Sequence, residues 1–200
     1  FDANDRSTYM KKVWGSHPIW EIYSRAQFGQ LQADIWRYCI IYEQGGYYWD
    51  INKGCQVALS DLHPPAATGM LSFESNPYLE IPDETVLQRV AFPLNLVAQW
   101  GFAFVERHRL LEILIDSIVE TAPMFFGRTF FSPKNAILAL SGPGAFTRAL
   151  HDYIRTDPVC ELEQAGIDFH NKGIFRLRGA TVPKGGPQPY GKRRYEPILR

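Results

Sequence analysis

The clearest periodicity in the chain is a helical one over residues 27–44. Apolar side chains recur there at spacings of three and four residues and form one stripe, made of Phe28, Leu31, Ile35, Tyr38 or Cys39, and Tyr42. Gly45 and Gly46 follow, and glycine readily takes the left-handed conformation that ends a helix. Residues 47–51 are aromatic and β-prone, which predicts a strand that enters the core.

The rest of the chain alternates between helical and strand-like patterns. Further helices are predicted at a short segment ending at Trp14, at 107–121, at 133–140 and at 145–155. We expect Asp5 or Ser7 to cap the first of these, and a turn to follow it at residues 15–18. Strands are predicted at 69–73 and 95–100, with irregular connections at the intervening prolines. Mixed helices and strands in one short chain indicate an α/β layered domain.

Size and composition indicate a single packed domain. The chain has 200 residues and 46% hydrophobic content, and 21 basic residues balance 21 acidic ones. The absence of net charge argues against nucleic acid as a partner. We expect a core over residues 1–178 and a tail at 179–200, rich in glycine, proline and basic side chains, that forms a loop.

The chain starts at Phe1, and we expect it to be a piece of a longer protein. No apolar run approaches the ~18 residues that cross a bilayer, so membrane association is expected only through segments outside this chain. Cys39, Cys55 and Cys160 are too scattered for a disulfide framework or a zinc site. We expect buried free thiols, which favour a reducing compartment, and a Cys39–Cys55 bridge is the alternative in a secretory one.

Polar residues on the 27–44 helix and after it form a candidate site. Asp34 and Arg37 are three residues apart and therefore neighbours, and alone they would be a surface ion pair worth about 0.3–0.5 kcal/mol. The double glycine leads into a strand that delivers Asp50 to its far end. If residues 50–52 are extended, Asp50 and Asn52 project to the same side. Such a pair suits a divalent cation and a ribose or diphosphate, and a departing nucleoside diphosphate needs its charge neutralised.

Several fixed spacings in this segment resemble a known family. Ala33-Asp34-Ile35-Trp36-Arg37-Tyr38, Ile41-Tyr42, Gly45-Gly46-Tyr47-Tyr48 and Asp50-Ile51-Asn52 are similar to the sugar-binding region with the Asp-x-Asp motif in glycosyltransferase family 32. That family includes yeast Golgi mannosyltransferases and bacterial capsule and lipopolysaccharide transferases. The resemblance covers residues 1–62 and resumes at 99–111 and at Ser141-Gly142-Pro143, where the family usually has Thr-Gly-Pro.

The resemblance implies a GT-A-like nucleotide-diphospho-sugar transferase fold, with a mixed sheet flanked by helices and with N-terminal strands upstream of this chain. It implies retaining transfer of a hexose (mannose, glucose or galactose) from a nucleotide sugar such as GDP-mannose or a UDP-hexose. The acceptor would be a glycan, glycolipid or polysaccharide, with Mn²⁺ or Mg²⁺ as cofactor. Relatives act at the cytosolic side in bacteria or in the Golgi lumen in fungi, and both compartments stay open.

The resemblance also assigns roles to individual residues. Asp34 and Arg37 would contact the donor sugar and its diphosphate, next to Tyr38. Asp50 would hold the ribose and, with Asn52, the metal. Gly45 and Gly46 belong to this donor-binding segment because they shape its turn.

One departure from the family pattern opens a second hypothesis. Asn52 stands where the family has Asp, and its amide oxygen is a possible ligand that brings no charge. The alternative function is therefore a catalytically degenerate paralogue that binds a sugar nucleotide or glycan without turnover. The His-rich or Trp-rich C-terminal motif of relatives is also missing from the sequence.

Other candidates have a plainer structural interpretation. Glu74 and Asn76 follow a predicted strand, where acceptor contacts or a surface loop are both possible, and Trp100 suits core packing better than stacking on a sugar. The Ser141–Gly144 segment suits a turn between helices at least as well as a phosphate contact. His170 is expected to be structural, and the basic tail residues Lys184, Lys192, Arg193 and Arg194 are expected to be solvated.

Overall fold

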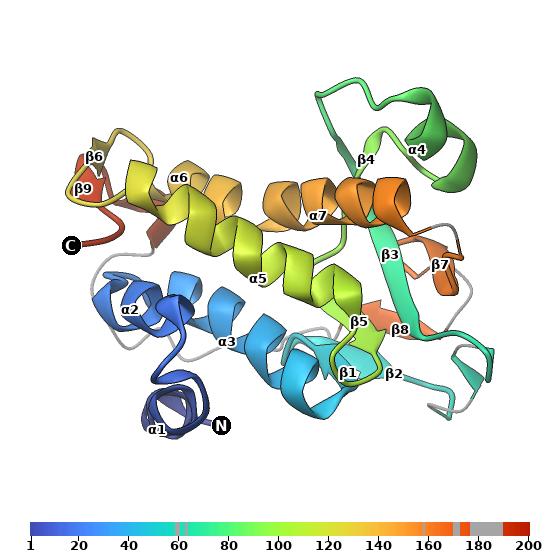
Figure 1. Ribbon diagram of the computed structural model, residues 1–200, viewed down its shortest axis with the longest axis horizontal. Helices are drawn as coiled ribbons and strands as arrows, with labels where there is room; N and C mark the ends of the chain where they lie inside the picture. Colours follow the sequence, from blue (N-terminus) through green and yellow to red (C-terminus); the bar gives the residue numbers. More distant parts are fainter. Residues whose placement is uncertain (59–60, 63, 158, 170–172, 177–189) are drawn as a thin grey trace.

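The computed structural model in Figure 1 describes residues 1–58, 61–62, 64–157, 159–169, 173–176 and 190–200. The helices are α1 (Ala3–Trp14), α2 (Pro18–Arg25), α3 (Gly29–Gln44), α4 (Glu84–Arg89), α5 (Arg109–Thr121), α6 (Pro133–Leu140) and α7 (Pro143–Thr156), with 3₁₀ turns η2 (Ala122–Met124) and η3 (Tyr190–Lys192). The strands are β1 (Gly46–Trp49), β2 (Lys53–Cys55), β3 (Gly69–Pro77), β4 (Asn95–Val97), β5 (Gly101–Phe104), β6 (Thr129–Phe130), β7 (Leu162–Ile167), β8 (Ile174–Arg176) and β9 (Glu196–Pro197).

The central sheet is mixed. β1, β5, β3 and β4 are joined in that order by antiparallel pairing, and β7 pairs with β3 in parallel. Helices α3, α5 and α7 run side by side along the molecule, with α5 between the other two (Figure 1). This arrangement confirms the predicted α/β class and is consistent with the GT-A-like fold that the resemblance implies.

Helix α3 follows its predicted apolar stripe. Leu31, Ile35, Tyr38 and Cys39 are all buried in the main core. The helix ends at Gly45, whose φ of 62° lies in the left-handed region. A Cβ atom built on Gly45 would lie 2.8 Å from the backbone nitrogen of Glu106, so a side chain is also excluded by contact. The predicted glycine stop is therefore confirmed.

Strand β1 is shorter than predicted, and residues 50–52 are not extended. The pairing of β1 with β5 ends at Trp49 opposite Gly101, because β5 begins there. Beyond that point the chain turns, and the Lys53 amide donates to the Asp50 carbonyl at 2.8 Å. The expectation that Asp50 and Asn52 share one side of a strand is therefore wrong. Ile51, between them, is exposed.

Only the first half of the segment predicted as a strand at 95–100 forms one. β4 ends at Val97, and the chain passes through a corner at residues 98–100 before β5 begins. β5 was not predicted, because all four of its residues are buried and no apolar–polar alternation marks it. Gly101 opens this strand against the Trp49 ring, where a Cβ atom would lie 2.3 Å from a ring carbon.

The N-terminal helices differ from the predicted ones in extent. α1 is capped by Asp2, not by Asp5 or Ser7, and the Asp5 side chain accepts from the Asp2 amide to complete a capping box. The turn after Trp14 is so short that α2 follows at once, with Pro18 in its first turn. The predicted turn at 15–18 therefore covers both the end of one helix and the start of the next.

The C-terminal residues are part of the fold, which corrects the expectation of a loop from residue 179 to the end. β9 pairs with β6, and Ile198 and Leu199 are fully buried in the main core. Residues 177–189 lie outside the described residues. Burial of the apolar side chains Ile198 and Leu199 stabilises the packing of the chain end, which the Gly, Pro and basic composition did not indicate.

All three cysteines are free, and the alternative Cys39–Cys55 bridge is not formed. Cys39 is buried as predicted, but Cys55 is exposed and Cys160 is half-buried. Among the described residues, none of the helices is both long and apolar enough to cross a membrane.

The contribution of the chain end is testable. We expect Leu199→Ala to lower the free energy of unfolding by about 2–5 kcal/mol, because it leaves a cavity in the core. Val159→Ala, at an exposed position, is the control and should change it by less than about 0.5 kcal/mol. Chemical denaturation measures both values, and equal effects of the two variants would contradict the packing of Leu199.

Candidate functional site

A cavity of about 820 Å³ opens beside α3, at the end of β1. Its walls come from α3, the end of β3 and the loop after it, the β4–β5 corner, and the helices α6 and α7. The polar or charged side chains among the lining residues are Gln30, Asp34, Arg37, Asp50, Glu74, Asn76, Tyr78, Glu80, Gln99, Lys134, Asn135 and Arg148. The cavity therefore gathers groups from segments that are far apart in the sequence.

Asp34 and Arg37 form an ion pair at the cavity wall. The Arg37 Nη2 atom lies 3.1 Å from Asp34 Oδ1. Asp34 is only 7% exposed and Arg37 only 9%. The simple alternative of a surface ion pair is therefore wrong. A buried pair needs further hydrogen bonds to compensate for the loss of water.

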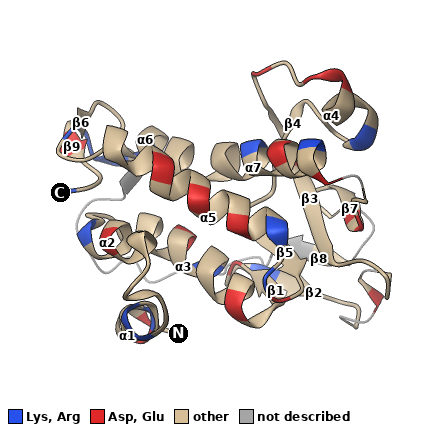
Figure 2. Ribbon diagram, in the orientation of Figure 1, with Lys and Arg blue, Asp and Glu red and all other residues tan. Residues whose placement is uncertain are grey.

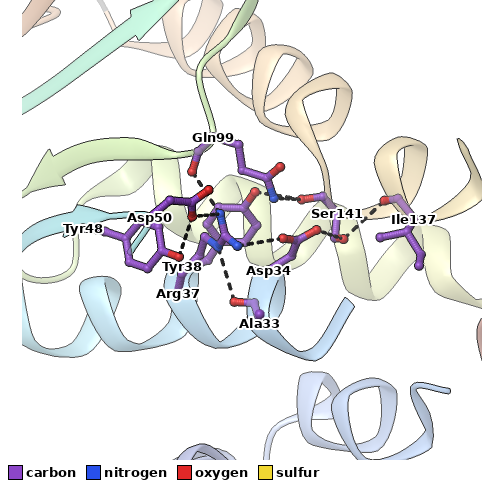
Figure 3. A network of polar contacts seen from close by, with 9 residues as sticks. All are labelled: Ala33, Asp34, Arg37, Tyr38, Tyr48, Asp50, Gln99, Ile137 and Ser141. Carbon is purple, nitrogen blue, oxygen red and sulfur yellow. Dashed lines mark hydrogen bonds and ion pairs between the residues drawn. The ribbon is translucent and has the colours of Figure 1, made fainter. Parts of the chain in front are cut away.

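Asp50 reaches the same guanidinium from the end of β1. Its Oδ1 atom lies 3.4 Å from Arg37 Nη1 and accepts a hydrogen bond of 2.9 Å from the Tyr48 hydroxyl. Arg37 also packs over the Tyr48 ring, 4.7 Å from its centroid. Figure 3 shows Arg37 between the two carboxylates. The structure thus brings together Asp34, Arg37 and Asp50, as their predicted roles require.

Gln99 and Ser141 hold Asp34 and Arg37 in place. Gln99 was not predicted to belong to the site, and Ser141 was considered only as part of a turn or a phosphate contact. The Gln99 carbonyl accepts from Arg37 Nη1 at 3.2 Å, and the Gln99 amide donates to the Ser141 carbonyl at 3.2 Å. Ser141 donates through its hydroxyl to Asp34 Oδ2 at 2.9 Å (Figure 3). A signal for Gln99 was available, because it is a polar residue inside an apolar strand-like run.

The protonation of this network follows from its burial. Burial raises the pKa of Asp34 to about 6, although Arg37 and hydrogen bonds from Gln99 and Ser141 lower it. Burial alone would lower the pKa of Arg37, but Asp34 and its other neighbours raise it overall, so the guanidinium stays charged. Burial also raises the pKa of Tyr48, which therefore remains a hydrogen-bond donor to Asp50.

Other predicted donor-binding residues lie outside the cavity wall. Tyr38 is fully buried, and its hydroxyl donates to the Ser141 carbonyl at 2.7 Å, so it supports the site from behind. Gly45 and Gly46 are at the opposite end of β1 from Asp50 and line a separate hollow of about 330 Å³. Asn52 is in the turn after Asp50 and is not among the lining residues.

Several secondary candidates do reach the cavity. Glu74 and Asn76 line it at the end of β3, and the Asn76 amide donates to Glu74 Oε2 at 2.9 Å. Burial raises the pKa of Glu74 above its usual value. Trp100 lines the cavity as well, and the Lys53 ammonium lies 3.6 Å from its ring centroid. Trp100 adjoins Asp50, whose backbone amide donates to the Trp100 carbonyl at 2.8 Å.

Among the described residues of the C-terminal segment, no basic side chain lines the cavity. Arg193 pairs with Glu196 and packs over Phe28, and Arg194 packs over Phe131. Lys192 and Arg194 are exposed, as expected, whereas Arg193 is half-buried, so the expectation of a solvated side chain is wrong for Arg193. Figure 2 shows how the charged residues are distributed over the fold. Lys184 and His170 lie outside the described residues.

A divalent cation would need oxygen ligands near Asp50. Asp50 Oδ1 takes the hydrogen bonds from Arg37 and Tyr48, which leaves Oδ2 as a ligand atom. The Asn52 Oδ1 atom is buried without a hydrogen-bond partner. Asn52 does not line the cavity, so of the two motif residues only Asp50 offers an oxygen atom to a cation there. No group of three or more His, Cys, Asp or Glu is placed to hold a metal within the described part of the chain.

Comparison with known proteins identifies the segment that carries the site. Residues 2–68 match the family described as glycosyltransferase sugar-binding region containing DXD motif. This match supports the glycosyltransferase assignment that the resemblance predicts, and with it a transferase.

One solved structure similar to this chain is a PaToxG glycosyltransferase, with a TM-score of 0.44 and 18% sequence identity. The similarity covers 75% of this chain and 42% of that one, so the chain spans less than half of the length of that relative. No match is found among curated proteins.

The raised pKa of Asp34 has a testable effect on stability. In the folded protein Asp34 holds its proton up to about pH 6, against an ordinary value of 3.8. Its contribution to the free energy of unfolding should therefore fall as pH rises from about 4 to about 6. We expect the free energy of unfolding of the wild type minus that of Asp34→Asn to decrease over this window. Denaturant titration at each pH measures both values.

Asp116→Asn, at an exposed position on α5, controls for the loss of one surface carboxylate. A wild-type–Asp34→Asn difference that grows with pH would contradict the raised pKa.

Proposed function

We propose that this chain, whose residues 2–68 match the DXD glycosyltransferase region, carries the donor site of a retaining hexosyltransferase. The reaction would move mannose, glucose or galactose from a nucleoside diphosphate sugar to a glycan, glycolipid or polysaccharide acceptor. The observation that carries this proposal is the convergence of Asp34, Arg37 and Asp50 on one wall of an 820 Å³ cavity.

The donor is assigned to the wall with the buried ion pair. Arg37 uses Nη1 for Asp50 and the Gln99 carbonyl, Nη2 for Asp34 and Nε for the Ala33 carbonyl. Because a guanidinium has five N–H donors, one on Nη2 remains for a ligand. Asp34 is suited to accept hydrogen bonds from sugar hydroxyls. Asp50 is suited to the ribose of the nucleotide.

Charge on the leaving diphosphate has to be offset during the reaction. Arg37 lies on one wall of the cavity, and Lys134 and Arg148 line it from α6 and α7. A divalent cation held by Asp50, with Asn52 as the second ligand that the resemblance implies, would add Lewis-acid neutralisation of the diphosphate when bound. The cations of the chain itself contribute to the field that favours departure of the diphosphate.

The acceptor is assigned to the wall with Glu74 and Asn76. Both line the cavity from the end of β3, and a carboxylate with a raised pKa is well placed to accept a hydrogen bond from a hydroxyl. The acceptor oxygen would form its bond to the anomeric carbon on the face from which the diphosphate leaves. The bond from that carbon to the phosphate oxygen breaks, its electron pair stays on the diphosphate, and the acceptor proton passes to the leaving oxygen. The configuration is then retained.

The second candidate is a degenerate paralogue that binds donor without turnover. It is favoured by Asn52, which brings no charge to the motif and lies in a turn away from the cavity lining. In this case the same wall would hold the nucleotide sugar. Turnover would be lost because the diphosphate charge is incompletely neutralised.

Turnover is tested on purified full-length protein with a panel of nucleotide sugars and manganese, following release of nucleoside diphosphate. We expect hydrolysis or transfer with at least one donor, and Asp50→Asn should lower kcat/KM by about 10²–10³-fold through loss of the charge next to Arg37. Asp116→Asn is the matched control and should be unchanged. Absence of turnover with every donor would exclude the transferase proposal.

The Asn52 substitution separates the two candidates. Under the degenerate alternative, Asn52→Asp should create or greatly tighten manganese binding in calorimetry, since a carboxylate replaces a neutral amide oxygen at the motif. The degenerate paralogue requires weak binding by the wild type. If the wild type with donor present already binds manganese as tightly as Asn52→Asp does, the degenerate alternative is excluded.

A further inference from the structure

Ser141 occupies the corner between α6 and α7 and is fully buried. It is not among the residues that line the cavity, although Ala139 and Pro143 on either side of it are. Ser141 therefore acts on the site only through the residues that it contacts. Its backbone carbonyl accepts from Tyr38 at 2.7 Å and from Gln99 at 3.2 Å, and its hydroxyl contacts Asp34.

The single hydroxyl proton of Ser141 has two possible acceptors. Asp34 Oδ2 lies at 2.9 Å and the Ile137 carbonyl at 3.3 Å. A hydrogen bond to an ionised carboxylate is shorter and about twice as strong as one to a neutral carbonyl. The proton is therefore donated to Asp34, and the hydroxyl faces the carboxylate from the side opposite Arg37, which contacts Oδ1.

We propose that Ser141 is a positioning residue for the donor sugar, because its hydroxyl fixes the orientation of the Asp34 carboxylate. With Oδ1 held by Arg37 and Oδ2 by Ser141, the carboxylate cannot rotate, and its remaining lone pairs are presented to the cavity that Asp34 lines. This inference rests on the proposed function, since it assigns Asp34 to the donor. It adds a residue that lies 107 positions away in sequence.

The other carboxylate of the site is held through one oxygen only. The Tyr48 hydroxyl donates to Asp50, whose Oδ1 also contacts Arg37. The site is thus a linear chain of hydroxyl, carboxylate, guanidinium, carboxylate and hydroxyl (Figure 3). Only Asp34 is held through both oxygens, by Arg37 on Oδ1 and by Ser141 on Oδ2, whereas Asp50 Oδ2 takes neither of these contacts.

The hydroxyl and the carbonyl of Ser141 have separable roles. Tyr38 and Gln99 both donate hydrogen bonds to the backbone carbonyl of Ser141, which an alanine at this position retains. Ser141→Ala therefore removes the contact to Asp34 and keeps those ties. Ser132→Ala is the matched control. Ser132 lies at the other end of α6, where its hydroxyl oxygen caps the helix by accepting from the Asn135 amide.

The experiment follows the Asp34 carboxyl carbon by ¹³C NMR over pH, with Asp34→Asn used to assign the signal. In Ser141→Ala we expect the titration midpoint of Asp34 to rise, because a hydrogen bond to the charged form is lost. In Ser132→Ala the midpoint should stay at the wild-type value. For the donor that turns over, kcat/KM should fall about tenfold in Ser141→Ala, as expected for one hydrogen bond to a charged group.

The titration decides the proposal separately from turnover. An Asp34 midpoint unchanged in Ser141→Ala would overturn it, as would an equal shift in Ser132→Ala, which would assign the effect to loosening of α6. If the wild type shows no turnover with any donor, the proposed function fails. In that case a raised midpoint confined to Ser141→Ala still shows that Ser141 orients Asp34.

Discussion

A buried guanidinium held between two carboxylates is the interaction on which the rest of the site depends. Arg37 is 9% exposed, and its charge is compensated by Asp34 on its own helix, by Asp50 at the end of β1 and by the Gln99 carbonyl at the β4–β5 corner. Removal of one partner of such a pair typically costs about 3–5 kcal/mol, because the remaining charge stays buried. The site therefore forms only when helix, strand and corner have all packed.

The part of this site that could be predicted from the sequence is local. Asp34, Arg37 and Asp50 lie on one helix–turn–strand unit, and the double glycine between the elements announces the turn. Gln99 and Ser141 join the network across 62 and 107 residues, and a contact across such a distance leaves no periodicity in the sequence. The geometry of residues 50–52 was out of reach for a similar reason, since β1 ends where its distant partner β5 begins.

The fold shows the same limit. The amphipathic helices α3 and α5 were predicted because their apolar stripes mark the buried face, whereas β5 is buried throughout and carries no alternation. At the end of the chain, composition indicated a loop, but Ile198 and Leu199 are buried in the core. Pairing and burial with remote segments decided these cases, and local propensity did not.

The cavity is lined by two chemically different groups of residues, to which the proposed function assigns the donor and the acceptor. Asp34, Arg37 and Asp50 form one wall from a rigid network, whereas Glu74 and Asn76 form the other from the end of β3. A network in which each charged group already has partners needs little rearrangement when a ligand binds, so its orientation is set before the donor arrives.

The length of the segment from Arg37 to Asp50 is fixed by the pairing of β1 with β5. Arg37 and Asp50 are 13 residues apart, and the register of β1 against β5 runs from Gly46 opposite Phe104 to Trp49 opposite Gly101. Side chains alternate between the faces of a strand, so one added residue between Gly46 and Asp50 would turn the carboxylate to the other face or break the pairing. A change in the length of this segment would therefore separate the arginine from its second carboxylate.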